Sequence, residues 1–210
     1  MTRILAIDTS TDACSVALLS GDSVQALLEH APRRHNQLLL GMLRELLPDG
    51  PSGLDAVAYG CGPGSFTGLR ITASAVQGIC FAAQLPALPV STLASQVQTA
   101  IRLGFAAEGS WVLSTLDAHI GELYWALFEV VDARPRAVSA DSACDPEALT
   151  ISGDQPLIAV GSGLNYQNAI PAQLQSRFTR TCPELEPCAE DLLPLAQRAL
   201  AAGEIQSADA

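Results

Sequence analysis

The chain has 210 residues, of which 49% are apolar and only 16% are charged, so we expect a sizeable buried core in one large or two small domains rather than disorder. The net charge is −11 and all eleven basic residues are arginines, which excludes lysine-dependent chemistry and disfavours an RNA-binding surface of clustered basic residues. The apolar opening run is too short for a signal peptide and no run of 18 apolar residues occurs, so we expect a cytoplasmic protein with no membrane association.

The first half of the chain begins with a predicted β-hairpin and continues with alternating helices and strands. Apolar runs separated by short turns predict the hairpin and a third strand, and leucine-rich periodicity predicts the first helix. The expected elements are, in order, strands at 3–8, 13–19 and 23–29, a helix at 36–47, a strand at 54–59, a helix at 69–84, a strand at 87–90 and a helix from Ser91 or Thr92 to about 103.

The second half begins again with an apolar strand that ends in an aspartate, Asp117. A short turn leads to a second strand rich in β-forming residues, and a glycine loop follows a later strand. The expected elements are strands at 111–117, 122–131, 136–140 and 157–160, a helix near 164–174 and a helix at 191–202 that stops at Gly203.

The two halves share one plan, a hairpin and a further strand followed by helices alternating with strands. In each half the first strand ends in aspartate, Asp8 and Asp117 respectively. This plan indicates an α/β protein with the duplicated two-lobe fold of actin, sugar kinases and Hsp70. We expect lobes at 1–104 and 105–210, with the final helix, about 190–203, free to pack back on the first lobe.

In that architecture both hairpin turns contact the phosphates of ATP, which makes the two turns candidate phosphate loops. A tight turn of small hydroxylated residues lets backbone N–H groups approach phosphate, and its carboxylate can hold a magnesium-bound water. The alternative is an ordinary hairpin with local side-chain hydrogen bonds. The candidate phosphate-contacting residues, as remnants of an ATP site, are Asp8, Thr9, Ser10, Asp117, Gly161 and Gly163.

The most distinctive stretch is the glycine-rich segment GCGPGSFTGLR at 60–70. Its glycines permit close backbone approach, and Ser65 or Thr67 can cap the following helix, whose N-terminus attracts anions. The segment matches neither a P-loop nor a well-placed dinucleotide fingerprint. Functional and structural interpretations of these glycines both remain open.

The helix at 36–47 has seven apolar residues among ten, which is more than one packed face requires. One interpretation is a central core helix; the other places one side on the core and the other on a partner chain. The next helix carries small residues suited to close packing, and we expect packing to require its internal Gly78. The candidate interface residues are His35, Leu38, Leu39, Met42, Leu43, Leu46, Phe66, Thr67, Gly68, Leu69, Arg70, Thr72 and Ala75.

Other site chemistry finds little support in the sequence. The histidines are poorly spaced for a metal, since Pro32 separates His30 from His35 and His119 stands alone, so no metal site is expected. There is no GxSxG nucleophile motif. Three of the six cysteines lie in apolar segments and are expected to be buried and inert: Cys14, Cys61 and Cys80.

Several stretches in order resemble the TsaB (YeaZ) family over most of residues 3–203. They are ILAIDTSTDACSVALL, His35 with the leucine-rich helix after it, LDAVAYGCGPGSFTGLRI, LPALPVSTLA, LDAHIGELYWA and AEDLLPLA. The GPGSFTGLRI segment together with the DTST hairpin is the most specific part of the resemblance.

The resemblance implies a non-catalytic subunit that pairs with the paralogue TsaD and, through the complex, with the ATPase TsaE. The complex transfers a threonylcarbamoyl group to the adenosine beside the anticodon of ANN-decoding tRNAs. It further implies a homodimer when the protein is alone and no required cofactor, since ATP and a metal belong to the partner proteins. Direct tRNA binding is not expected. The alternative is a stand-alone actin-like ATPase or kinase that uses Asp8 and Asp117.

Overall fold

The computed structural model describes residues 1–206, which form two compact units. One unit comprises Met1–Ser95 together with the chain from Pro187 onward, and the other comprises Gln96–Glu186. The division falls inside helix α3 (Thr92–Arg102), earlier than the expected boundary after residue 104. The last helix belongs to the first unit by its contacts. Among residues 1–206, no helix is both long and apolar enough to cross a bilayer.

The first unit is built on a five-stranded sheet with the order β3-β2-β1-β4-β5. Strands β1, β2 and β3 pair antiparallel, whereas β1, β4 and β5 pair parallel. The central strand β1 is a continuous apolar run because both of its faces are buried. The strand bounds are β1 (Arg3–Asp8), β2 (Ala13–Ser20), β3 (Ser23–His30), β4 (Ala56–Gly60) and β5 (Ala87–Val90).

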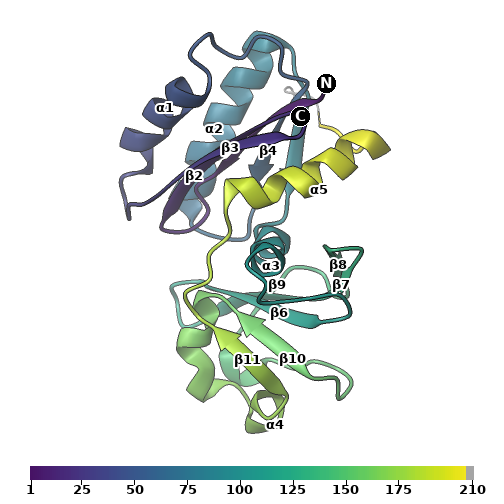
Figure 1. Cartoon of the computed structure of the whole chain (residues 1–210). Helices are drawn as coiled ribbons and strands as arrows, with labels where there is room; N and C mark the ends of the chain where they lie inside the picture. The colour runs from purple at the N-terminus through teal and green to yellow at the C-terminus, as the bar shows by residue number, and fades with distance from the viewer. Residues whose placement is uncertain (207–210) are drawn as a thin grey trace. The chain divides into compact units, whose positions relative to one another are not determined.

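Helices cover both faces of this sheet, as Figure 1 shows. Helices α1 (His35–Leu46) and α2 (Phe66–Ala83) pack on the face that carries Leu5 and Ile7. Helix α5 (Ala189–Ala202) packs on the opposite face, against the alternating residues Ile4 and Ala6.

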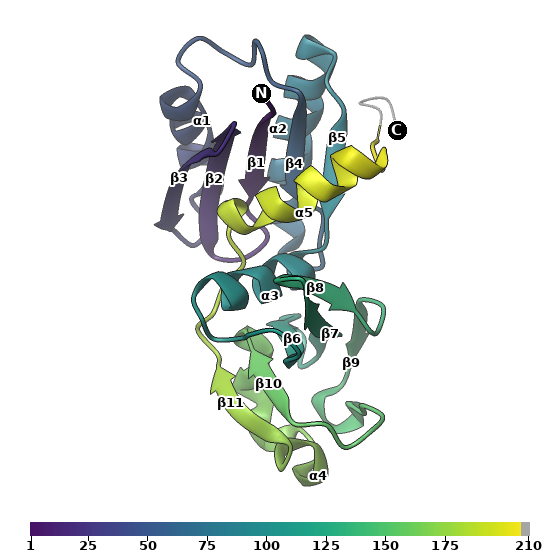
Figure 2. The same ribbon diagram turned by 45° about the vertical axis from the view of Figure 1, so that its right-hand side comes forward.

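The second unit holds a six-stranded sheet of order β11-β10-β6-β7-β8, in which β9 also pairs with β7 (Figure 2). Two 3-10 helices and a short α-helix complete it. The bounds are β6 (Trp111–Asp117), β7 (Leu123–Val131), β8 (Arg134–Ala137), β9 (Ser142–Cys144), η1 (Pro146–Ala148), β10 (Leu157–Val160), η2 (Ser162–Ala169), α4 (Ala172–Gln175) and β11 (Phe178–Cys182).

Both sheets have the same topology. In each, an antiparallel hairpin comes first, a third strand extends it on one side, and two parallel strands extend it on the other. Strands β1 and β6 therefore occupy equivalent central places. The duplicated actin-like α/β fold predicted from the sequence is confirmed.

Several element bounds differ from the sequence-based expectation. The helix expected near 164–174 is instead η2 followed by α4, because Pro171 and an extended Ile170 interrupt it. Helix α2 begins at Phe66, three residues before the expected start, because the Ser65 side chain caps it by accepting a hydrogen bond from Gly68 N–H at 3.3 Å. Strands β9 and β11 were not expected.

Candidate functional site

The first hairpin turn, between β1 and β2, is closed by its own side chains. Asp8 Oδ1 accepts hydrogen bonds from the backbone N–H of Ser10 at 2.7 Å and from its hydroxyl at 2.6 Å. Asp8, Thr9 and Ser10 are each no more than 2% exposed. This is the geometry of a self-supporting turn, and both Ser10 donors are already occupied within the protein.

The start of α2 packs directly on this turn. Thr9 Oγ1 lies 2.7 Å from the carbonyl oxygen of Gly68 and 2.6 Å from Thr72 Oγ1, and Ser65 N–H donates to the carbonyl of Ser10 at 2.7 Å. A Cβ atom on Gly68 would lie far inside contact distance of the Thr9 carbonyl. The glycine at 68 is therefore required for helix α2 to approach the turn, which gives it a packing role.

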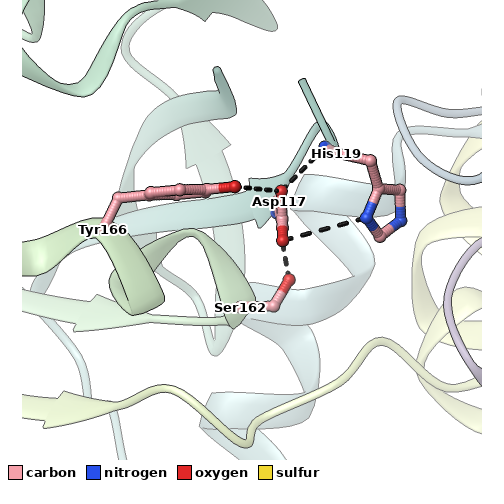
Figure 3. A network of polar contacts seen from close by, with 4 residues as sticks. All are labelled: Asp117, His119, Ser162 and Tyr166. Carbon is pink, nitrogen blue, oxygen red and sulfur yellow. Dashed lines mark hydrogen bonds and ion pairs between the residues drawn. The ribbon is translucent and has the colours of Figure 1, made fainter. Parts of the chain in front are cut away.

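The second hairpin turn, between β6 and β7, is held by Asp117 (Figure 3). Asp117 Oδ1 accepts hydrogen bonds from His119 N–H at 2.7 Å and from Tyr166 Oη at 3.1 Å, and Asp117 N–H donates to Ser162 Oγ at 3.0 Å. The hydrogen bond to the Asp117 carboxylate is the main cause that raises the pKa of Tyr166 above its usual value. Unlike the first turn, this one leaves His119 largely exposed, 3.8 Å from Asp117 Oδ2 through its Nδ1 atom.

The two glycines predicted to approach phosphate in the second unit contact β6 instead. Cβ atoms on Gly161 and Gly163 would collide with the backbone and side chain of Thr115. Thr115 Oγ1 donates to the carbonyl of Val160 at 2.9 Å, which ties the end of β10 to β6. The observed contacts give both glycines a packing role, and phosphate binding by them stays a prediction.

Helices α1 and α2 carry an exposed apolar surface in the first unit. Leu40 is 60% exposed and Phe66 is 69% exposed. Between the helices lies a groove of about 570 Å³ that these two residues line together with Thr67, Ile71 and Ala75. The Arg70 guanidinium stacks 3.9 Å above the Phe66 ring, so the rim of the groove holds a cation–π pair.

The predicted interface residues divide between this surface and the core. Four of the predicted residues in α1 are buried in the core of their own unit, namely Leu39, Met42, Leu43 and Leu46. His35, the first residue of α1, is buried as well. Gly68 and Thr72 are buried as well. The outer surface retains Phe66, Thr67 and Arg70, with Leu38, Leu69 and Ala75 partly buried. Helix α1 is thus amphipathic rather than apolar on all sides, and its most exposed apolar residue, Leu40, was missing from the predicted set.

Two further expectations need correction. A Cβ atom on Gly78 would meet nothing within 4 Å in this chain, so packing within the chain does not require this glycine. Cys61 is exposed because it lies in the loop after β4, whereas Cys14 and Cys80 are buried as expected. Burial raises the pKa of the Cys14 and Cys80 thiols to about 11. Within residues 1–206, no group of three or more His, Cys, Asp or Glu side chains is arranged to hold a metal ion.

Sequence reasoning missed the partners of Asp117. Tyr166 and Ser162 lie more than 40 residues from it, and only the pairing of β10 with β6 brings them to the second turn. The usable signal was the glycine loop at 161–163 directly after a strand, which the duplicated topology places beside β6.

Comparisons with known proteins give a family model named for TsaD and curated relatives named TsaB. Residues 28–207 match the family model described as TsaD: tRNA N6-adenosine threonylcarbamoyltransferase. The chain is 37% identical over 211 residues to the tRNA threonylcarbamoyladenosine biosynthesis protein TsaB of Escherichia coli K12, covering 96% of this chain and 89% of the relative. It is 37% identical over 174 residues to the Haemophilus influenzae protein of the same name, covering 76% and 72%. Among solved structures, YeaZ from Pseudomonas aeruginosa superposes with a TM-score of 0.92 at 39% identity, covering 100% of this chain and 97% of that one.

Proposed function

Because the chain belongs to the TsaB family, we propose that it serves tRNA threonylcarbamoyladenosine biosynthesis as a non-catalytic subunit. It pairs with the TsaD paralogue and, through that pair, works with the ATPase TsaE. The complex transfers a threonylcarbamoyl group to the adenosine beside the anticodon of ANN-decoding tRNAs. ATP and the metal are supplied at the partner proteins, and this subunit contributes the surface that supports the catalytic paralogue.

The main support for pairing with TsaD is the groove between α1 and α2. Leu40 and Phe66 stand out from two adjacent helices, and a patch of this kind marks a protein interface more often than a free surface. An apolar groove rimmed by an aromatic ring and an arginine resembles the centre of known interfaces, where such residues contribute most of the binding energy. The same surface serves the homodimer when the protein is alone, so the two assemblies exclude each other.

The state of the first hairpin turn supports a non-catalytic role. Asp8 Oδ1 accepts both hydrogen bonds from Ser10, and Thr9 holds the start of α2. A phosphate at this turn would have to displace hydrogen bonds that stabilise the fold. The turn therefore acts in folding, and it anchors one of the two helices that form the pairing surface.

Co-purification with the cell's TsaD paralogue tests the pairing. Leu40→Asp and Phe66→Asp each place an unpaired carboxylate in the contact, which costs several kcal/mol and should abolish pairing of moderate affinity. Leu103→Asp is the matched control, since Leu103 is equally exposed, at 62%, but lies at the end of α3. Normal pairing by folded Leu40→Asp and Phe66→Asp proteins would place the interface elsewhere.

ATP turnover by the purified chain, measured with and without magnesium, distinguishes the proposed non-catalytic subunit from a stand-alone ATPase or kinase. If the chain is a non-catalytic subunit, it should turn over ATP no faster than an Asp8→Asn, Asp117→Asn double variant. Appreciable magnesium-dependent turnover that this variant loses would favour the enzyme.

A further inference from the structure

Arg70 is the one charged residue that lines the groove between α1 and α2. The other residues of the lining are apolar or neutral. Among residues 1–206, the Arg70 side chain stacks on the Phe66 ring but forms no hydrogen bond or ion pair. The groove therefore carries a positive charge that no carboxylate of residues 1–206 neutralises.

Stacking on Phe66 positions the Arg70 guanidinium without using its hydrogen-bond donors. The Arg70 Cζ atom lies 3.9 Å from the centre of the ring, so the ring supports one face of the guanidinium. The N–H groups of a guanidinium lie in its plane, in a fork that matches the two oxygens of a carboxylate. A stacked guanidinium can therefore still bind a carboxylate through two parallel hydrogen bonds. Because the stack already restrains the side chain, less conformational entropy is lost when such a pair forms.

Neither helix of the groove offers a carboxylate to Arg70. Helix α2 contains no Asp or Glu. The one acid of α1, Glu45, lies near the end of the helix and lines a separate hollow together with Arg3 and Ser20. Two copies of this chain that met through their grooves would bring two guanidinium groups into the contact and no carboxylate from either lining. Enclosing a charge without a counter-charge lowers the affinity of an interface.

The apolar surroundings of Arg70 make its charge important for the choice of partner. Leu40 and Phe66 are exposed in the free chain and become covered when a partner fills the groove. Covering them removes water from around Arg70, and interactions between charges strengthen as water is excluded. A partner that supplies a carboxylate gains from this, and a partner without one leaves Arg70 enclosed and unpaired. Binding specificity arises from such a penalty on the wrong partner as well as from contacts to the right one.

We propose that the TsaD paralogue sets an aspartate or glutamate against Arg70, and that this ion pair makes the groove prefer TsaD over a second copy of this chain. The carboxylate accepts hydrogen bonds from the edge of the guanidinium while Phe66 supports its face. That the partner is TsaD rests on the proposed function. That the partner must supply a carboxylate rests on Arg70 and on the uncharged lining around it.

Arg70→Met tests the proposal when binding to TsaD and self-association of the chain are both measured. Methionine keeps a long apolar side chain beside the Phe66 ring and removes the charge and the donors. Titration with purified TsaD should show binding weakened at least tenfold, while sedimentation of the variant alone should show self-association unchanged or stronger. A general loss of packing would weaken both. Unchanged binding of TsaD, or equal weakening of the two assemblies, overturns the proposal.

Arg198→Met is the matched control for the loss of one positive charge. Arg198 is also an exposed arginine on a helix, but it lies on α5, which packs on the opposite face of the sheet. This variant should bind TsaD as tightly as the unmodified chain does. An equal loss of binding with Arg198→Met would show that TsaD responds to the overall charge of the chain, which contradicts a specific pair at Arg70.

Charge exchange identifies the carboxylate. Arg70→Glu should prevent binding, and the surface Asp and Glu residues of TsaD are then changed singly to Arg. One of these TsaD variants should restore binding to the Arg70→Glu chain and should bind the unmodified chain more weakly. If none restores it while Phe66→Asp still abolishes pairing, the ion pair is wrong and the proposed function stands. If Phe66→Asp pairs normally, the groove is not the TsaD interface and both fail.

Discussion

Two glycines of the same helix, Gly68 and Gly78, should respond oppositely to alanine. At Gly68 the added Cβ runs into the Thr9 carbonyl, so we expect Gly68→Ala to lower the free energy of unfolding by about 3 kcal/mol. At Gly78 the space is open, and alanine should stabilise the helix by about 0.5–1 kcal/mol. Urea unfolding of both variants measures the difference. A tolerated Gly68→Ala would mean that α2 does not sit on the first turn.

The cysteines give a second test at the residue scale. Burial raises the pKa of Cys14 and Cys80 to about 11, so neither forms a thiolate in the folded protein at pH 8. Iodoacetamide should therefore modify exposed Cys61 and leave these two until the protein unfolds. Unfolded thiols ionise near pH 9, so this part of the stability is present below pH 9 and is lost as pH rises toward 11. Mass spectrometry measures the labelling of each cysteine. Equal labelling of Cys14 and Cys61 would contradict the burial of Cys14.

At the residue scale, the sequence identified the turn residues but not their use. The DTST tetrapeptide is compatible with a phosphate loop and with a closed hairpin. The difference depends on Thr9, whose hydroxyl meets residues of α2 about 60 positions away. Such a contact is a consequence of tertiary packing and carries no local signal.

At the scale of elements, helix α5 should stabilise the first unit. Leu192 is fully buried against β1, β2 and β4, so Leu192→Ala should lower stability by about 2–5 kcal/mol. Hydrogen exchange should show faster exchange in β1 and β4, while β6 and β10 of the second unit stay protected. Leu200→Ala, at a partly buried position near the end of α5, is the milder control. Unchanged protection in β1 would contradict the packing of α5 on this sheet.

Elements with strong periodicity and clear end signals were predictable. Strands β1, β2 and β6 follow from their apolar runs, and α5 ends at Gly203 as expected. The segment 162–175 was not, because its apolar residues suggested one helix while Pro171 interrupts it. The apolar character of the outer side of α1 was also overestimated. Its buried leucines, at 39, 43 and 46, form one stripe with the spacing of a helix face, and a count of apolar residues alone did not separate this stripe from the exposed side.

At the scale of the whole molecule, charge argues against direct RNA binding. The net charge is −11 and the sequence contains no lysine, so few phosphates can be neutralised. The isolated protein should bind tRNA no more tightly than about 10⁻⁴ M at physiological salt, the weak end of non-specific affinity. Fluorescence anisotropy with labelled tRNA measures this. Micromolar binding that weakens steeply with added salt would reveal a basic surface on the folded protein.

In the proposed function, this subunit supports the reaction through its surface and not through its own carboxylates. Reconstitution with TsaD, TsaE, tRNA, threonine, bicarbonate and ATP tests it, with threonylcarbamoyladenosine measured by mass spectrometry of digested tRNA. We predict that modification requires this chain and is lost with Phe66→Asp. We predict that it survives Asp8→Asn, because the amide oxygen can still accept the Ser10 hydrogen bonds. A folded Asp8→Asn protein that pairs with TsaD yet supports no modification would contradict a non-catalytic role.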